Sequence, residues 1–471
     1  MRDCNRGRFR QQFRFLRRQF LQDGDLPFNN VLSEEIVKQA LTSTGIVWNE
    51  RIFTPLVTLW VFLGQVLNVD HSCRAAVARL NSHRLSRGLR PCSSETGAYC
   101  QARKRLPEKF FSTVARLTGQ ALDAGSNSNW FWKGRRVYLF DGSTVSMPDT
   151  PSNQEDYPQH DSQKPGLGFP LARITAIFSL SCGAITDLGI CRYAGKGQGE
   201  LSLFRNLCSF FRPGDVVLTD RLYCTWRELL TLKQRGVDSV SQLQAMRRAD
   251  FRKGKRLGKG DHIVRWKRPM IRSLSWQARK ELPEYLTVRE CRIQIEQAGF
   301  RSKAIVVVTT LLDPQEFSKD DLAGLYQARW NVETDLRCLK QTLQMDILRC
   351  KTPELVRKEI WTHILAYNLI RTVMAQAALQ NGIQPRTISF KATLQFLEEF
   401  QRLIDYQEHR GRDYRLLLYQ QLLNCIASQR VADRPNRFEP RLLKRRPKHF
   451  AFLRRPREVI KREMTRVRRQ N

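Results

Sequence analysis

The sequence lacks the patterns that mark a membrane, secreted or zinc-binding protein. Its longest apolar run, Pro55–Leu67, is shorter than the ~18–20 residues that a membrane-spanning helix needs. The first 20 residues contain no apolar run before a small-residue cleavage site, so they predict no secretory signal. Twelve cysteines are scattered without a CxxC pair, a Cys/His zinc spacing or an HExxH motif. We therefore expect reduced thiols in a cytoplasmic protein that has no membrane partner.

Negative charge is also scarce. Asp and Glu number 45 against 80 Lys and Arg, which gives a net charge of +35 and a pI near 10.3. The excess is concentrated in residues 1–20 (net +6), 246–268 (net +8) and 434–471 (net +12). Separate basic blocks suit several contacts along a phosphate backbone, so nucleic acid is the expected partner. For the N-terminal block, a solvated tail is the alternative; the C-terminal block interleaves apolar residues, which favours a contact.

Short apolar runs and helical patterns alternate after a helical first quarter of the chain. Residues 30–120 are mostly helical in pattern and basic, which suits either DNA docking or a scaffold. Beyond residue 134 the expected strands are 137–140, 171–181, 184–191, 216–219, 237–245, 263–266, 288–295 and 305–310, and the expected helices are 200–211, 224–235, 319–346 and 353–380. This order predicts an α/β fold with a mixed sheet.

Two acidic residues follow buried-looking strands. Asp141 ends the run that begins at Val137, and Asp220 ends the run that begins at Val216. Open α/β sheets place their sites at such strand ends. Two carboxylates brought together there repel unless cations neutralise them, which predicts a site for Mg²⁺ or Mn²⁺. The alternative is that each Asp merely ends a strand.

A third group lies in the segment LYQARWNVETDLRCLK. At 100° per residue, Tyr326, Arg329, Glu333 and Lys340 fall within roughly 60° of one helix face. Such a face would suit the binding of a metal ion and phosphates. The alternative is a solvated helix that carries an Arg329–Glu333 pair at i, i+4.

These residues resemble the signature of a family of bacterial insertion-sequence transposases of the DDE class. The spacing Y-x2-R-x3-E-x6-K is similar to one family motif, and Asp141-Gly-Ser and Asp220-Arg-Leu-Tyr are similar to the other two acidic motifs. The segments GDVVLTDRLY and EPRLLKRRPKHF, the Gly-rich turn before Glu200, and Trp330 also resemble the family. The similarity covers roughly residues 90–460.

The resemblance implies a ribonuclease-H-like catalytic core, a mixed sheet with flanking helices, interrupted by a strand-rich insertion. The catalytic and metal-binding triad would be Asp141, Asp220 and Glu333, with two Mg²⁺ or Mn²⁺ ions supporting phosphoryl transfer. The substrate would be double-stranded DNA: the element's inverted repeats and the target. The first step would nick the element's ends, and the freed 3′-OH would then attack the second strand or the target.

On this basis we expect five segments. They are a helical, basic N-terminal domain for DNA-end recognition (1–133), the first part of the core (134–245), a basic insertion (246–300), the second part of the core with the Glu333 helix (301–381), and a helical region with a basic tail for dimerisation and DNA contact (382–471).

Further residues are expected to contact DNA. By resemblance, Tyr326, Arg329 and Lys340 would hold phosphates beside the cut. Arg221, next to Asp220, would either touch phosphate or form an ion pair.

A hairpin intermediate, which members of this family form, needs a stacking partner for an extruded base. The insertion offers Trp266 and Trp276, and the motif offers Trp330. We expect Trp266 to stack on the base, the alternative being that it packs the insertion's core.

Two DNA ends must be brought together, so the resemblance implies a homodimer on DNA in the bacterial nucleoid. Apolar helical runs in residues 382–425 would either form the partner contact or complete the fold. Two other functions stay open at this point: a catalytically silent DNA-binding repressor derived from a transposase, and a structure-selective nuclease of the same fold.

Overall fold

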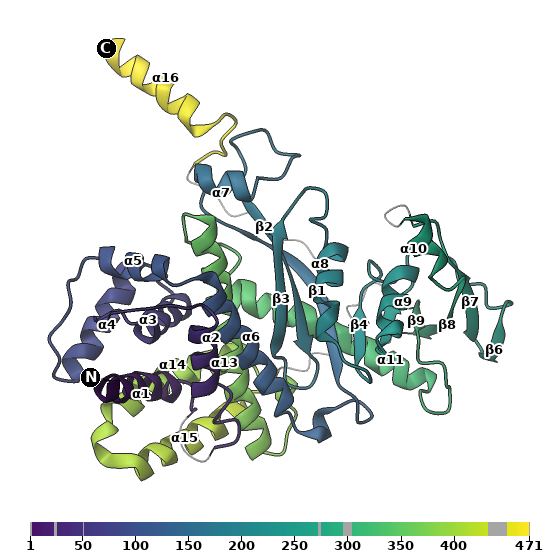
Figure 1. Cartoon of the computed structure of the whole chain (residues 1–471), viewed down its shortest axis with the longest axis horizontal. Coiled ribbons are helices and arrows are strands. Elements are labelled where there is room, and N and C mark those ends of the chain that lie inside the picture. The colour runs from purple at the N-terminus through teal and green to yellow at the C-terminus, as the bar shows by residue number, and fades with distance from the viewer. Residues whose placement is uncertain are drawn as a thin grey trace.

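The expected strands assemble into a single mixed sheet flanked by helices (Figure 1). The computed structural model describes residues 2–22, 26–49, 51–271, 275–294, 304–431 and 450–470. The strands of this part of the chain are β1 (Val137–Ser146), β2 (Leu171–Ser179), β3 (Ile185–Arg192), β4 (Val216–Thr219), β5 (Asp238–Gln242), β6 (Lys255–Gly258), β7 (Asp261–Lys267), β8 (Tyr285–Gln294) and β9 (Ala304–Thr309).

The first five strands form the ribonuclease-H-like core. Their order across the sheet is β3-β2-β1-β4-β5, where β1 to β3 are antiparallel and β4 and β5 run parallel to β1. β9 pairs antiparallel with β5, and β8, β7 and β6 follow in turn. The strands of the predicted insertion therefore extend the core sheet at its far edge, on the right in Figure 1.

Helices precede and follow the sheet in the chain. They are α1 (Arg2–Arg18), α2 (Glu34–Thr42), α3 (Pro55–Leu67), α4 (Cys73–Ser86), α5 (Gly97–Arg105), α6 (Glu108–Ala124), α7 (Pro151–Asp156), α8 (Glu200–Leu207), α9 (Trp226–Gln234), α10 (Trp276–Lys280), α11 (Lys319–Gln327), α12 (Asn331–Arg337), α13 (Pro353–Gln380), α14 (Phe390–Tyr406), α15 (Gly411–Ser428) and α16 (Arg457–Gln470). Within the described residues, no helix is both long and apolar enough to span a membrane.

The buried helix α13 joins the helical part of the molecule to the sheet. It packs against α3, α6, α14 and α15 and also contacts β3. Nearly every side chain from Leu355 to Ala378 is buried, including polar ones such as Asn368 and Arg371. The N-terminal helices, α14 and α15 therefore share one continuous hydrophobic core with the strands that carry the acidic motifs.

The helix predicted for residues 319–346 is not a uniform α-helix. The helical path runs from Lys319 to Thr342, but a 3-10 turn at Ala328–Trp330 separates α11 from α12, and a π-helical segment follows at Cys338–Thr342. A constant rotation of 100° per residue was therefore the wrong assumption for this segment, because 3-10 and π turns advance by other angles.

The two ends of the chain differ in their packing. Phe13 and Leu16 of α1 are buried in the main core. α16 projects away from the body of the molecule (Figure 1), and its described side chains are mostly exposed. Most of the predicted basic contact segment EPRLLKRRPKHF lies outside the described residues.

Candidate active site

Two of the predicted acids lie side by side on neighbouring strands. β1 and β4 pair in parallel, with Leu139 opposite Leu218. Continuing that register by two residues places Asp141 opposite Asp220, on strands about 4.8 Å apart. The parallel register of the core sheet thus brings together two acids that are 79 positions apart in the chain.

The strand ends differ from the prediction for one of the two acids. Asp220 directly follows Thr219, the last residue of β4, as expected. Asp141 lies in the middle of β1, because the antiparallel partner β2 continues the pairing past it, with Ala176 opposite Asp141. The pairing of β1 with β4 stops at Leu139, so Asp141 still lies just beyond the edge of the parallel sheet.

Arg329 connects the first predicted acid to the third. Its guanidinium is 3.9 Å from the Asp141 carboxylate and donates to Glu333 Oε1 at 3.1 Å. The Arg329 side chain is 11% exposed, whereas that of Glu333 is 54% exposed. The i, i+4 pair foreseen as the alternative therefore exists, but it is turned toward Asp141 rather than into open solvent. Arg329 is therefore the link between Glu333 and Asp141.

The other three residues of the motif surround this point. Tyr326 is buried, its ring centroid lies 5.9 Å from the Arg329 guanidinium carbon, and burial raises the pKa of its phenol. Trp330 packs edge-on against Tyr326, with ring centroids 5.9 Å apart. Lys340 Nζ donates to Ser143 Oγ on β1 at 3.1 Å. Arg329 and Lys340 of the motif therefore lie against β1, at Asp141 and Ser143, although the helix that carries them is irregular.

Glu200 is a neighbour of the site that the sequence did not single out as a candidate. It is the first residue of α8, accepts a hydrogen bond from Tyr223 Oη at 3.3 Å, and lies 3.6 Å from the Arg173 guanidinium. A Cβ atom on Gly142 would come within 3.2 Å of the Glu200 carboxyl carbon. Its only sequence signal was the Gly-rich turn before it, and an acid in the first turn of a helix is common for electrostatic reasons alone.

The concentration of carboxylates changes the titration of Asp141. Burial raises the pKa of Asp141 to about 6, and the charges of Asp220 and Glu200 add to the effect. The backbone N–H of Gly142 and the Arg329 guanidinium oppose it. Asp141 is therefore a carboxylate whose charge is only partly compensated by the protein.

The site has the chemistry of a hard-cation site without closed coordination. Among the described residues, no three His, Cys, Asp or Glu side chains converge closely enough to form a complete metal cluster. Arg329 pairs with Glu333 and lies 3.9 Å from Asp141, so these two carboxylates share its positive charge. The oxygen-only donor set and the raised pKa of Asp141 fit Mg²⁺ or Mn²⁺.

Two further predicted DNA contacts, Arg221 and Trp266, differ in their surroundings. Arg221 is exposed beside Asp220. Trp266 is only 6% exposed and belongs to a hydrophobic cluster that β7, β8 and α9 share. Its indole N–H donates to Glu290 Oε1 at 2.8 Å, and the Arg247 guanidinium carbon lies 4.1 Å from its ring centroid. The packing alternative is thus realised for Trp266, although it also lines a basic cavity of about 680 Å³.

The other tryptophan of the insertion is more accessible. Trp276 is 63% exposed, and Lys280 Nζ lies 3.7 Å from its ring centroid. Trp330 is half-buried against the main core. The choice of a stacking residue among the three stays a prediction.

Comparison with known proteins decides the family. Residues 132–369, about half of the chain, match the family model described as the transposase DDE domain. The chain belongs to the DDE transposase family. The matched region of this transposase contains Asp141, Asp220, Glu333 and Lys340. The resemblance drawn from the motifs is confirmed.

Two relatives of the chain are themselves named as transposases of insertion sequences. The transposase is 28% identical over 364 residues to transposase InsG of insertion sequence element IS4 from Escherichia coli, covering 76% of this chain and 79% of the relative. It is 36% identical over 69 residues to the Escherichia coli transposase of insertion sequence element IS421, covering 15% and 19%. A solved structure of the piggyBac transposase synaptic complex with hairpin DNA has a TM-score of 0.43 and 10% identity, covering 85% of this chain and 84% of that one.

The family establishes the general activity. The chain is a DNA transposase, an enzyme that binds DNA and depends on a divalent cation. A silent repressor and a structure-selective nuclease, which the sequence left open, are not favoured by these relationships.

Proposed function

We propose that this transposase cleaves the inverted-repeat ends of its insertion sequence and joins them to target DNA with Asp141, Asp220 and Glu333 as the catalytic acids. The observation that carries the proposal is the position of Arg329. Its guanidinium lies 3.9 Å from Asp141 and pairs with Glu333, so it links the third acid to the strand of the first. All three acids lie within the residues that match the DDE domain, in the motifs that resemble those of the family.

The three carboxylates would hold two Mg²⁺ or Mn²⁺ ions. When bound, the ions supply Lewis-acid activation of a water or DNA 3′-OH and stabilise the leaving oxygen. Binding them requires that Asp141 be ionised and that Arg329 release at least one of its two carboxylate partners. A released Arg329 would then be free to pair with a DNA phosphate, for which its planar fork is suited.

The other residues of the motif would hold the DNA strand at the cut. Lys340 and Arg221 would supply positive charge to phosphates on either side of the acids. Tyr326 would present its hydroxyl beside Arg329, and Trp330 would support that ring from behind. Together they would fix the scissile phosphate in line with the attacking hydroxyl, where most of the rate gain from positioning arises.

The end would pass through a hairpin in which one base is extruded and stacked. Trp266 is our choice of partner, because it lines a cavity with Arg247, Lys253 and Lys255. In the free protein Arg247 covers its ring, so stacking on Trp266 requires this arginine to move. Trp276 and Trp330 stay as alternatives for the same role.

Two copies of the transposase would act together, because two element ends must meet. The apolar runs of residues 382–425 mostly complete the fold, since Phe390, Leu397 and Ile404 are buried. Leu403, Tyr406 and Leu417 of the same region remain exposed on α14 and α15. We assign the protein–protein contact of a homodimer on DNA to that surface, and we place the assembly at the nucleoid, where its DNA lies.

The test is cleavage of a supercoiled plasmid that carries the element's inverted repeats, with Mg²⁺ or Mn²⁺ present or chelated. Wild type is compared with Glu333→Gln and with Glu398→Gln. Glu398 is a matched control, because it is 47% exposed, pairs with Arg402 at i, i+4 on α14 and belongs to none of the acidic motifs.

We expect wild type and Glu398→Gln to cut at the repeat ends only with metal. Glu333→Gln should be slower by about 10³-fold or more, because it removes a member of a catalytic unit. Equal cutting by all three proteins would show that Glu333 is not the third acid. DNA binding without cutting by wild type would favour a repressor, and cutting without joined products would favour a nuclease.

A further inference from the structure

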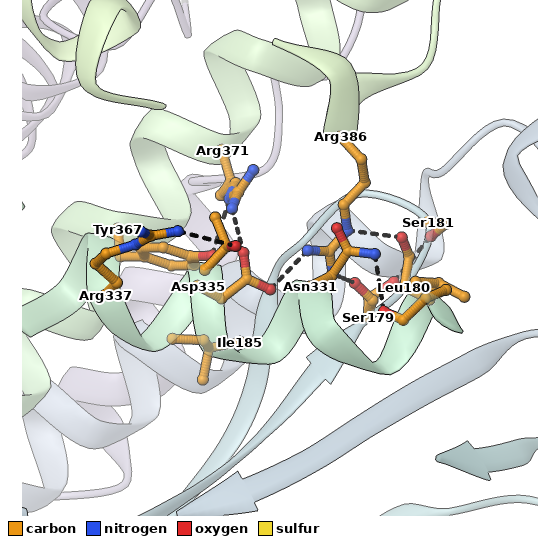
Figure 2. Close-up of polar contacts among 12 residues, drawn as sticks. Ser179, Leu180, Ser181, Ile185, Asn331, Asp335, Arg337, Tyr367, Arg371 and Arg386 are labelled. Atoms are coloured by element: carbon orange, nitrogen blue, oxygen red, sulfur yellow. Dashed lines mark hydrogen bonds and ion pairs between the residues drawn. The ribbon is translucent and has the colours of Figure 1, made fainter. Parts of the chain in front are cut away.

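A buried carboxylate lies behind the proposed third acid. Asp335 follows Glu333 by two residues on α12, and its side chain is 1% exposed. It accepts hydrogen bonds from Arg371 of α13 on Oδ1 and from Arg386 on Oδ2, the latter at 2.6 Å. Figure 2 shows the two guanidiniums meeting this one carboxylate. Asp335, Arg371 and Arg386 are not among the residues that define the motifs.

Both arginines also contact the turn between β2 and β3. Arg386 donates through Nε to the Leu180 carbonyl at 2.8 Å and through Nη2 to the Ser179 carbonyl at 2.5 Å. The Arg371 guanidinium lies under Gly183, where a Cβ atom would come within 2.9 Å of its central carbon. Gly183 has a φ of +80°, so this close approach and the turn itself both require glycine.

The network therefore connects the elements that carry the two ends of the triad. Asp335 belongs to the helix of Glu333, and the turn belongs to β2, whose Ala176 pairs with Asp141 on β1. α12 has only seven residues between a 3-10 turn and a π-helical segment, so its own backbone fixes its direction weakly. Its buried Val332 and Leu336 anchor it in the main core, and the network with Asp335 adds a polar restraint on its orientation.

The charge of the network makes this restraint specific. The buried Arg371 and the half-buried Arg386 share one carboxylate, while Arg371 also donates to Tyr367 Oη at 2.9 Å and Arg386 to the two carbonyls. With the carboxylate in place, each of the three charged groups has hydrogen-bonding partners. Without it, the two guanidiniums would lose the anion that lies between them, and the contact of α12 with Arg371 and Arg386 would be weakened.

We propose that Asp335, held by Arg371 and Arg386, is the positioning residue that sets the distance of Glu333 from Asp141. This inference rests on the proposed role of Glu333. Outer contacts of this kind orient the ligands of metal sites in general.

The test compares Asp335→Asn with a matched control, Asp261→Asn. Asp261 is also buried, with 8% of its side chain exposed, and pairs with Arg289 at 2.9 and 2.6 Å on the far strands β7 and β8. Three quantities are measured: hydrogen–deuterium exchange of residues 331–342 without metal, Mn²⁺ binding by electron paramagnetic resonance, and affinity for repeat-end DNA.

In Asp335→Asn we expect faster exchange in this segment and Mn²⁺ binding weaker by about 10–100-fold, with DNA affinity changed less than twofold. Asp261→Asn should alter none of these, although both variants lose stability. Wild-type exchange and Mn²⁺ binding in a folded Asp335→Asn would overturn the proposal.

If Asp335→Asn does not fold, Arg386→Lys provides the second variant. It keeps the positive charge but loses the fork that reaches Ser179 and Leu180, so it should shift exchange and Mn²⁺ binding in the same direction. No shift in Arg386→Lys would then overturn the proposal. Failure of the proposed function is distinct: Glu333→Gln would cut normally, while the metal-free exchange result would still report on the restraint of α12.

Discussion

At the scale of single residues, Asp141 reduces the stability of the metal-free protein at neutral pH. The folded pKa of Asp141, about 6, lies above its ordinary value of 3.8. Between these values the folded state binds more protons than the unfolded state, so stability falls as pH rises from about 4 to about 6. The burial of Asp141, to which the charges of Asp220 and Glu200 add, therefore destabilises the metal-free fold at neutral pH.

Asp141→Asn should stabilise the metal-free protein at pH 7.5 but not at pH 4. The folded pKa of Asp141 exceeds its ordinary value by about two pH units, which corresponds to about 2–3 kcal/mol in the free energy of unfolding at pH 7.5. Urea unfolding with chelator present, at both pH values, measures the difference. Asp161→Asn is the control, because the Asp161 side chain is 84% exposed in a loop. An equal effect of Asp141→Asn at both pH values would contradict the prediction.

The residues of the site were predictable from sequence to different degrees. Asp141, Asp220 and Glu333 could be proposed because their motifs stand in order along the chain, and their roles stay a prediction. Glu200 could not, because its contacts with Tyr223 and Arg173 depend on the register of distant strands. For Arg329 the sequence allowed a surface ion pair or a site residue, and only the packing of α12 against β1 brings it within 3.9 Å of Asp141.

At the scale of elements, the contact of α6 with the sheet depends on a glycine, Gly119, at the point of closest approach. A Cβ atom on Gly119 would lie 2.0 Å from the Ile185 carbonyl oxygen of β3 and 2.6 Å from Asn368 Nδ2 of α13. Asn368 itself donates to the Ile185 carbonyl at 2.9 Å and accepts from the Ile185 N–H at 2.8 Å. α6, β3 and α13 meet at this point, and the atoms nearest to Gly119 are held by the backbone of β3 and by the hydrogen bonds of Asn368.

Gly119→Ala should therefore destabilise the transposase by about 1–3 kcal/mol or more, because an extra methyl group in a packed interior displaces backbone. The midpoint of urea unfolding measures it. Gly64→Ala in α3 is the matched control, since its Cβ would have only one neighbour within 4 Å, at 3.9 Å. The control should gain about 0.5–1 kcal/mol from helix propensity. Equal effects of the two substitutions would refute the close packing of α6.

Local pattern predicted most elements but not the irregular ones. β4 begins and ends as its apolar run predicts, and the turn at Cys182–Gly183 joins β2 to β3 as expected. The 3-10 turn at Ala328–Trp330 was not predictable, since it accompanies the burial of Tyr326 and Arg329 against other elements. The continuation of the core sheet into β8, β7 and β6 depends on pairing with β9, which follows them in the chain. Such non-local pairing leaves no periodic signal in sequence.

At the scale of the whole molecule, charge and exposed apolar surface oppose each other. Two copies, each with a net charge of +35, repel strongly at low ionic strength. Leu403, Tyr406 and Leu417 nevertheless leave apolar surface exposed on α14 and α15. DNA binding should remove this repulsion, because the phosphates neutralise the basic surfaces while the duplex holds two copies close together. Assembly should therefore follow DNA binding rather than precede it.

We expect the transposase to sediment as a monomer at about 50 mM salt, where charges are screened only beyond about 14 Å, and as a dimer with two repeat-end duplexes. Tyr406→Asp should abolish the dimeric complex while a single copy still binds one duplex, and Tyr406→Phe should preserve it. The pair of substitutions separates the apolar contact from the hydroxyl group at one position, where the side chain is 78% exposed. A dimer without DNA at low salt would show that the protein contact outweighs the repulsion, and a dimeric complex that survives Tyr406→Asp would place the interface elsewhere on the molecule.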